Sequence, residues 1–328
     1  MQPTSIDPSR TARERERGPG PRARRRAAQQ VRRTVALVIN GKAGRLLAAR
    51  GGPGSLTDLL RAAGFDIAPV PPGALPDRLE HAHATGADLV VIAGGDGTIA
   101  CAAQILANGG GTLGIIPAGT MNLLAKDLGI PGGDSQAAVD VLRNGTPRTI
   151  DAGDLNGHVF LCAAMFGAPA RMGHHREEGR HRGNKVAGWL YFARASLRSL
   201  MHDRPLRLSI TVGGATHIVR TSSLTMTVNA LNDATGAIFD RARLDGGMLC
   251  IYVVQHRSVL DLVRLAFNVL RGRIASDPSV TLLQGKTVRI ETKSEALRVL
   301  IDGEEHLVRT PLRATIMPGA LRVIAPAG

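Results

Sequence analysis

The chain has 328 residues and a formal net charge of +14 at pH 7, and 44% of its residues are hydrophobic while only 3% are aromatic. Its length suits two domains with separate cores. Apolar runs stay shorter than the roughly 18 residues that a membrane-spanning helix needs, and the charged N-terminus lacks the apolar core of a secretory signal. We therefore expect a cytoplasmic protein whose three cysteines (Cys101, Cys162 and Cys250) are reduced.

Residues 1–33 are predicted to form a disordered basic tail. They contain ten arginines and three acidic residues, for a net charge of +7, and almost no apolar side chains. Such a tail is either a solvated extension or a contact for anionic lipid, at about 1 kcal/mol per basic residue near the surface. Nucleic-acid binding is disfavoured because aromatic residues are scarce and no recognition motif is present. The sequence leaves the oligomeric state open.

Strands and helices are predicted to alternate through the first 150 residues. Strands are expected over 34–39, 65–70, 87–93 and 113–116, and helices over 55–63, 75–85, 99–106, 123–128 and 137–144. This alternation favours an α/β domain with a doubly wound, mostly parallel sheet.

Two of these strands end in glycine-threonine turns. The first turn is Gly94-Gly95-Asp96-Gly97-Thr98, and the second is Pro117-Ala118-Gly119-Thr120-Met121-Asn122. A strand, a glycine turn and a helix start aim backbone N–H groups at a phosphate. For the first turn taken alone, an ordinary connection with Asp96 as helix cap is the alternative. Because ligands of α/β folds bind at the carboxyl edge of the sheet, the pair of turns predicts a binding site at that edge.

GGDGT followed by P-x-G-T-x-N resembles the catalytic domain shared by diacylglycerol kinases, sphingosine kinases and soluble bacterial lipid kinases. The resemblance extends from Thr34 to the end of the chain. It implies that ATP binds with Mg²⁺ in a cleft between two domains. The residues that it implies as nucleotide contacts are Asn40, Gly44, Gly94, Gly95, Asp96, Gly97, Thr98, Gly119, Thr120 and Asn122.

Two segments of the first domain depart from the family pattern. The family's first phosphate loop is N-P-x-S-G, whereas here Gly41 and Ala43 replace the proline and the serine. After Asn122 the family often has Asp-Phe-Ala-Arg, whose charged ends join an ion-pair network. This chain has Leu-Leu-Ala-Lys there, and Lys126-Asp127 is expected to stand in partly for this network.

From about residue 149 the pattern changes to apolar and polar residues in alternation, as in half-buried antiparallel strands. We place residues 34–150 in a nucleotide-binding α/β domain and residues 151–309 in an antiparallel β-sandwich domain that binds the lipid substrate and carries a helix over 259–270. By resemblance, residues 310–328 return to the first domain. They are predicted to form a hairpin that turns at Pro318-Gly319.

An aromatic segment of the second domain resembles the part of the family that borders the lipid entry. Trp189, Tyr191 and Phe192 fall in a helix predicted over 189–200. By resemblance they line the opening through which the lipid enters, and ordinary core packing is the alternative.

The segment from Asn229 to Leu249 resembles the family stretch that holds a divalent ion. The family binds this ion through the second aspartate of D-D-G and neighbouring backbone carbonyls, but Gly246 occupies that position here. Hard cations such as Mg²⁺ prefer oxygen ligands. The ligand set that remains is Asp245 with the carbonyl groups of Arg243 and Met248.

Asp302-Gly303-Glu304 follows a predicted strand and matches the family turn that bears a proposed catalytic base. The resemblance implies that Asp302 takes the proton from the lipid hydroxyl and that Glu304 supports it or binds metal. Asp96 is the rival base. An ordinary hairpin turn is the alternative, because Asp-Gly is a common hairpin signal.

These features predict an ATP-dependent lipid kinase that phosphorylates diacylglycerol or a related neutral lipid and associates peripherally with the membrane. An NAD kinase-like enzyme with a soluble substrate is one alternative, although the T-G-S-T-A-Y stretch and the Asn-Glu pair that such enzymes need are missing. A nucleotide- or lipid-binding regulator with impaired catalysis is the other. The sequence does not identify the lipid.

Overall fold

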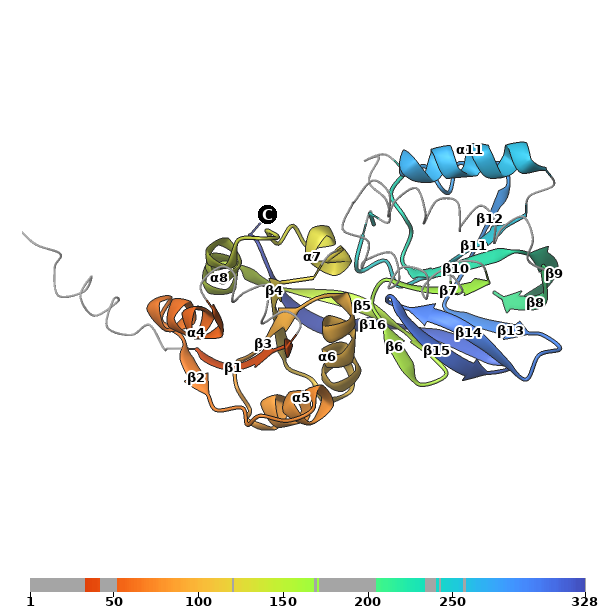
Figure 1. Cartoon of the computed structure of the whole chain (residues 1–328). Helices are drawn as coiled ribbons and strands as arrows, with labels where there is room; N and C mark the ends of the chain where they lie inside the picture. Colours follow the sequence, from red (N-terminus) through yellow and green to blue (C-terminus); the bar gives the residue numbers. More distant parts are fainter. Residues whose placement is uncertain are drawn as a thin grey trace, which may run out of the picture.

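The computed structural model describes residues 33–41, 52–119, 121–167, 170, 205–233, 240–241, 243–255 and 258–327 (Figure 1). Several predicted features lie outside these residues, namely the tail over 1–32, Gly44, Thr120, Trp189, Tyr191, Phe192 and the helix expected over 189–200.

The first domain is a parallel sheet with helices on both faces (Figure 1). Its parallel strands lie in the order β2-β1-β3-β4. The elements are β1 (Thr34–Ile39), α4 (Gly52–Ala62), β2 (Asp66–Ala68), α5 (Leu75–Ala84), β3 (Leu89–Gly94), α6 (Asp96–Gly109), β4 (Thr112–Pro117), α7 (Leu123–Asp127) and α8 (Ser135–Asn144). This arrangement confirms the predicted doubly wound α/β domain.

Alternate residues of β1 face two different cores. Ala36 and Val38 pack in one cluster with side chains of α5 and α6, whereas Val35 and Leu37 pack in another with side chains of α4 and α8. A strand that is covered on both faces needs apolar residues at every position. The unbroken runs of β1 and β3 therefore follow from their place in the middle of the sheet.

The long strand β16 (Leu312–Ala325) joins the two domains. It pairs in parallel with β4 near Arg322 and antiparallel with β5 (Thr146–Leu155), with one register shift between Met317 and Leu321. The hairpin predicted at Pro318-Gly319 is therefore wrong. Gly319 has φ +62° and its N–H donates to Asp151 Oδ1 at 2.9 Å, so the turn-like dipeptide forms a bulge inside a continuous strand.

The second domain consists of two packed antiparallel layers. One is a sheet in the order β12-β11-β10-β7-β14-β15, and the other continues from β16 through β13 and β8 to β9. The bounds are β6 (His158–Phe160), β7 (Ala163–Gly167), β8 (Leu206–Val212), β9 (Ala215–Thr221), β10 (Ser223–Val228), β11 (Leu249–Val254), β12 (Val280–Gly285), β13 (Thr287–Glu291), β14 (Ala296–Ile301) and β15 (Glu304–Arg309).

A single hydrophobic cluster fills the space between these layers. It includes Phe166 and Leu224 from one sheet and Ile210, Val288 and Leu312 from the other. Helix α11 (Val259–Leu270), which coincides with the predicted helix, lies across the outer side of this domain (Figure 1). Among the described residues, no helix is long and apolar enough to cross a membrane.

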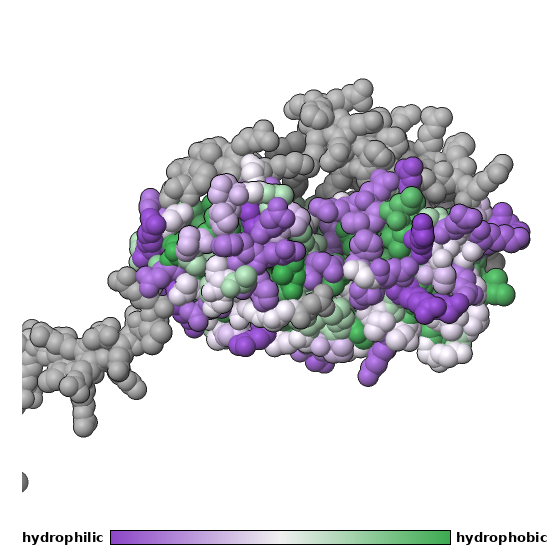
Figure 2. Space-filling view, turned by 90° about the horizontal axis from the view of Figure 1, so that it is seen from below, coloured by the Kyte–Doolittle hydropathy of each residue, from purple (hydrophilic) through white to green (hydrophobic). Residues whose placement is uncertain are grey.

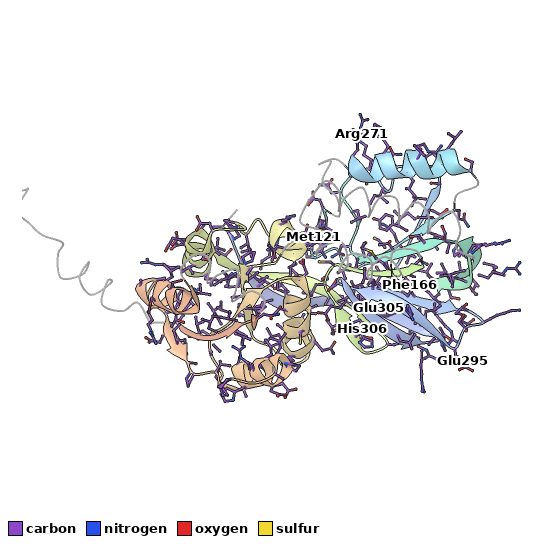
Figure 3. All side chains as sticks on the ribbon, in the orientation of Figure 1. Met121, Phe166, Arg271, Glu295, Glu305 and His306 are labelled. Atoms are coloured by element: carbon purple, nitrogen blue, oxygen red, sulfur yellow. The ribbon has the colours of Figure 1, made fainter. Side chains whose placement is uncertain are left out.

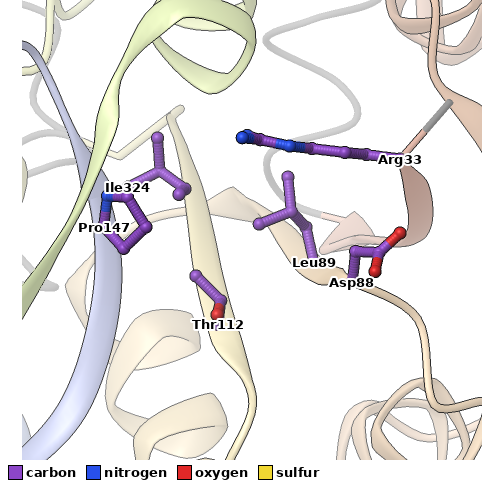
Figure 4. A pocket seen from close by; sticks show the side chains of 6 residues that line it. All are labelled: Arg33, Asp88, Leu89, Thr112, Pro147 and Ile324. Atoms are coloured by element: carbon purple, nitrogen blue, oxygen red, sulfur yellow. The ribbon is translucent and has the colours of Figure 1, made fainter. Parts of the chain in front are cut away.

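A small pocket of about 170 Å³ lies at the amino edge of the parallel sheet (Figure 4). Its lining residues are Arg33, Asp88, Leu89, Thr112, Pro147 and Ile324. The first four lie at the starts of β1, β3 and β4, and Pro147 and Ile324 lie on β5 and β16. The glycine turns, in contrast, lie at the ends of β3 and β4. The pocket is therefore at the opposite edge from the predicted site. On the face seen in Figure 2, hydrophobic residues are scattered among hydrophilic ones.

Candidate functional site

The first glycine turn connects β3 to α6 without any intervening loop. Gly95 is the N-cap residue, and the N–H groups of Thr98 and Ile99 already donate to its carbonyl oxygen. Asn40, at the end of β1, donates its side-chain amide to Thr98 Oγ1 at 2.6 Å. This bond ties the predicted first phosphate loop to the GGDGT turn at the carboxyl edge of the sheet.

The second turn is pressed against the first. A Cβ on Gly119 would lie 2.5 Å from the Cα of Gly95, so the two backbones approach as closely as only glycine permits. Asn122 adopts a left-handed conformation with φ +48°, and its side chain bonds both the N–H and the carbonyl group of Gly119. Asp96 Oδ1 accepts the N–H of Leu123 at 2.6 Å, which connects the turns a second time.

A basic side chain that sequence reasoning missed lies at the same edge. Arg78, in the first half of α5, donates Nη1 to the carbonyl oxygen of Ile39 at 2.8 Å. Its Nε is buried and has no hydrogen-bond partner within the part of the chain that the structure describes. Arg78 thus places a positive charge beside Asn40, but it falls in a helix with no recognisable motif.

In the acidic bend between β14 and β15, the carboxylates of Asp302 and Glu304 have different surroundings. Asp302 has φ +45°, and its carboxylate accepts the N–H groups of Leu161 at 2.6 Å and of Cys162 and Ala163 at 2.9 Å. Burial raises the pKa of Asp302, although these three donors and Arg241 lower it. Both oxygen atoms of Asp302 are therefore engaged with the backbone of its own domain.

Glu304 faces the first glycine turn. A Cβ on Gly97 would collide with Glu304 Oε1, so this carboxylate lies directly against the first turn of α6. Its charge also acts on Cys101, one helical turn further along α6, whose pKa is raised by burial and then by Glu304. The structure thus brings together the three distant segments that the sequence predicts to form one cleft: the two glycine turns and the acidic bend.

Two histidines lie close to the acidic bend. The rings of His158 and His306 have centroids 4.8 Å apart and are inclined by 51°. Burial and the neighbouring His158 lower the pKa of His306, while Glu304 raises it. Figure 3 shows His306 and Met121 near the junction between the two domains.

A buried ion pair crosses the same junction. Arg241 of the second domain donates Nε to Asp127 Oδ2 at 2.8 Å, and its Nη2 lies 2.7 Å from the same oxygen atom. The two side chains are only 3% and 4% exposed. Arg241 also donates Nη1 to the carbonyl oxygens of Leu161 and Val228. Asp127 is therefore the acidic member of an ion pair that joins the two domains. Its partner Arg241 has no recognisable signal in the sequence.

The carboxylate of the ligand set predicted for a divalent ion is bonded to a neighbouring arginine. Asp245 pairs with Arg243 at 3.1 Å, and their side chains are 51% and 70% exposed. The bond from Arg243 lowers the pKa of Asp245. Among the described residues, no group of three or more His, Cys, Asp or Glu side chains lies close enough to hold a metal ion. The ligand set that combines Asp245 with backbone carbonyls over 243–248 stays a prediction.

An asparagine occupies the space beside Gly246 instead. A Cβ on Gly246 would lie 2.8 Å from Asn229 Oδ1, which accepts the N–H of Met248 at 3.3 Å. Asn229 also donates its amide to Asp151 Oδ2 at 3.0 Å. Asp151 further accepts the N–H groups of Gly247 and Gly319, so one buried carboxylate joins three segments.

The fold and this site together define a two-domain phosphotransferase of the kinase type. Two family models match the chain: the diacylglycerol kinase catalytic domain over residues 34–155, and the YegS C-terminal NAD kinase beta sandwich-like domain over residues 163–325.

Relatives align over most of the chain. A diacylglycerol kinase of Mycobacterium tuberculosis is 30% identical over 310 residues, which cover 92% of this chain and 99% of that protein. A diacylglycerol kinase of Bacillus subtilis is 29% identical over 221 residues, covering 66% and 71%. A crystal structure of a diacylglycerol kinase from Bacillus anthracis superposes with a TM-score of 0.66 at 20% identity, covering 90% and 98%. The chain belongs to the family of diacylglycerol kinase-like lipid kinases.

Proposed function

We propose that this protein transfers the γ-phosphoryl group of ATP to the hydroxyl group of diacylglycerol or a related neutral lipid. The observation that carries the proposal is the contact of Glu304 with Gly97, because it sets a carboxylate of the second domain against the phosphate-type turn of the first. Family membership supports the same reaction class.

The nucleotide is proposed to bind at the carboxyl edge of β1, β3 and β4. The start of α6 offers backbone N–H groups and a partial positive charge to phosphates. Arg78 adds a formal positive charge beside Asn40. Phosphoryl transfer depends mainly on positioning and charge stabilisation, which is what such an edge supplies.

Glu304 is proposed as the group that accepts the proton of the lipid hydroxyl. It is exposed and faces the cleft, whereas the Asp302 carboxylate is held by three N–H donors and Asp96 accepts the N–H of Leu123. A base must come within about 3 Å of the proton that it removes. We therefore assign to Asp302 the positioning of the bend and to Asp96 the connection of the two turns.

Mg²⁺ is proposed to accompany the nucleotide. Asp96 is the proposed ligand at this edge, because carboxylate oxygen atoms suit a hard divalent cation. A bound Mg²⁺ would offset negative charge on the phosphate groups. The lipid acceptor implies transient contact with a membrane surface, as the prediction of peripheral association requires.

The proposal is tested by incubating the protein with radiolabelled ATP, Mg²⁺ and a panel of diacylglycerol, monoacylglycerol, sphingosine, phosphatidylglycerol and NAD. We expect label in a neutral lipid. Label in NAD would replace the proposal with a soluble substrate, and no label in any acceptor would favour a regulator without catalysis.

Two neighbouring glutamates provide a matched pair of variants. Glu304→Gln should lower the rate by about 10²-fold or more, as loss of a general base does. Glu305→Gln should leave it nearly unchanged, because Glu305 pairs with Arg298 at 3.2 Å. Equal rates for wild type and Glu304→Gln would remove Glu304 from the mechanism.

A further inference from the structure

Helix α11 exposes apolar side chains along one side. Leu260, Val263 and Phe267 are 79%, 55% and 52% exposed. They are spaced three and four residues apart, so they form one stripe on the helix surface. Within the part of the chain that the structure describes, the other large hydrophobic residues that are as exposed, Ile218 on β9 and Leu307 on β15, lie singly on edge strands.

The polar side chains of α11 are hydrogen-bonded within the protein. Asn268 donates to Asp277 Oδ2 at 2.7 Å, and Asp277 has a fully buried side chain. Asp261 accepts the N–H of Ser258 at the start of the helix and also bonds Arg264. The helix is therefore fixed in an orientation that leaves the apolar stripe outside.

A positive charge lies at one end of this stripe. Arg271 places its guanidinium 4.3 Å from the centroid of the Phe267 ring. Arg264 is 44% exposed, but its charge is compensated by Asp261 and Asp277, which are both bonded to it. Figure 3 shows Arg271 projecting from the outer side of α11.

We infer that the outer face of α11, formed by Leu260, Val263 and Phe267 with Arg271 just beyond the end of the helix, docks on an anionic lipid bilayer. A helix that presents leucine and phenylalanine beside a basic side chain lies in the interface between headgroups and acyl chains. The charge of Arg271 matches the negative surface of such a membrane. This surface is separate from the proposed phosphoryl-transfer site.

The test measures binding of the full-length protein to phosphatidylglycerol–phosphatidylcholine vesicles without nucleotide or diacylglycerol, so its result does not depend on the kinase assay. The variant Leu260→Ser/Val263→Ser/Phe267→Ser should bind about tenfold more weakly, because the apolar face drives insertion. The matched control Ile218→Ser removes a more exposed side chain and should bind like the wild type.

Salt separates the apolar contribution from that of the basic tail. At about 0.5 M salt the electrostatic attraction is largely screened, and the triple variant should still bind more weakly than the wild type. Arg271→Gln should weaken binding at low salt and have little effect at high salt. Equal weakening by Arg271→Gln at both salt concentrations would contradict its electrostatic role.

Three results would overturn the inference. The triple variant could bind vesicles like the wild type. It could be less stable to heat in lipid-free buffer, which would mean that the stripe packs within the chain. It could also change the mass of the lipid-free protein in light scattering, which would mean that a second copy covers the stripe.

Discussion

The sheet edge with the two glycine turns and the junction between the two domains are held together by different kinds of contact. At the edge, Gly94 to Thr98 and Pro117 to Asn122 bring two backbones into contact, and each turn is a continuous piece of sequence. At the junction, Asp127, Arg241 and Asp302 come from three distant segments and are held by buried charges. The proposed binding edge is thus built mainly from backbone contacts, while side chains far apart in sequence connect the two domains.

Removal of Arg241 should have the largest effect on stability. Arg241→Met leaves the Asp127 carboxylate buried without its partner, which should cost about 3–5 kcal/mol of unfolding free energy. Because burial already raises the pKa of Asp127, the loss should shrink as the pH falls and Asp127 becomes protonated. Urea unfolding at two pH values measures both effects.

The double variant Asp127→Leu/Arg241→Met is the control for this prediction. It removes both charges, and it should recover much of the stability lost in Arg241→Met. If the single variant were as stable as the wild type, the junction would not depend on this ion pair.

Asp302 should behave as part of the junction, in contrast to Glu304. Asp302→Ala leaves three N–H groups without an acceptor, which should cost about 3 kcal/mol in total, since water can reach this half-buried position. Glu304→Gln should leave the unfolding free energy unchanged and lower only the rate. Chemical denaturation of the two purified variants provides the comparison.

A different outcome would reassign the two carboxylates. If Asp302→Asn kept full stability and lost all kinase activity while Glu304→Gln remained active, Asp302 would be the proton acceptor. Asp302 would then belong to the reaction site and not to the contacts that hold the two domains together.

The sequence predicts the elements that repeat a local pattern. The bounds of β1 and α11 match those expected from apolar periodicity, and GGDGT with P-x-G-T-x-N locates the site edge. Pro318-Gly319 misled the prediction because its turn signal is local, whereas Asp151 holds Gly319 from a strand far away in sequence. Arg78 and Arg241 follow no periodicity, so nothing in the sequence indicates their partners.

A substitution at Gly246 should have an intermediate effect on the unfolding free energy. Gly246→Asp restores the residue type of the family pattern, but its Cβ must displace Asn229, which is buried and bonded to Asp151. We expect a loss of about 1–3 kcal/mol that Mg²⁺ does not reverse, measured by thermal unfolding with Mg²⁺ and with chelator. Gly132→Asp, where no atom lies within 4 Å of a new Cβ, is the matched control and should unfold like the wild type.

The smallest expected effect concerns His306. Burial and His158 hold its pKa below the usual value, so the folded state favours neutral His306. Its contribution to stability is then present above the unfolded pKa of about 6.5 and is lost as the pH falls through the lower folded pKa. Because His306 is only partly buried, solvent should keep this contribution below about 0.5 kcal/mol.

The measurement compares unfolding free energies at about pH 7.5 and 5.5. The wild type should lose slightly more stability than His306→Gln over this interval. His158→Gln should reduce the pH dependence as well, because it removes the like charge that lowers the pKa of His306. Since Glu304 raises the same pKa, Glu304→Gln should lower it further and steepen the dependence. If the pH dependence of the unfolding free energy were the same in all three variants as in the wild type, the imidazoles would not be coupled to Glu304. The position of the acidic bend would then be set by the bonds between Asp302 and its three backbone donors alone.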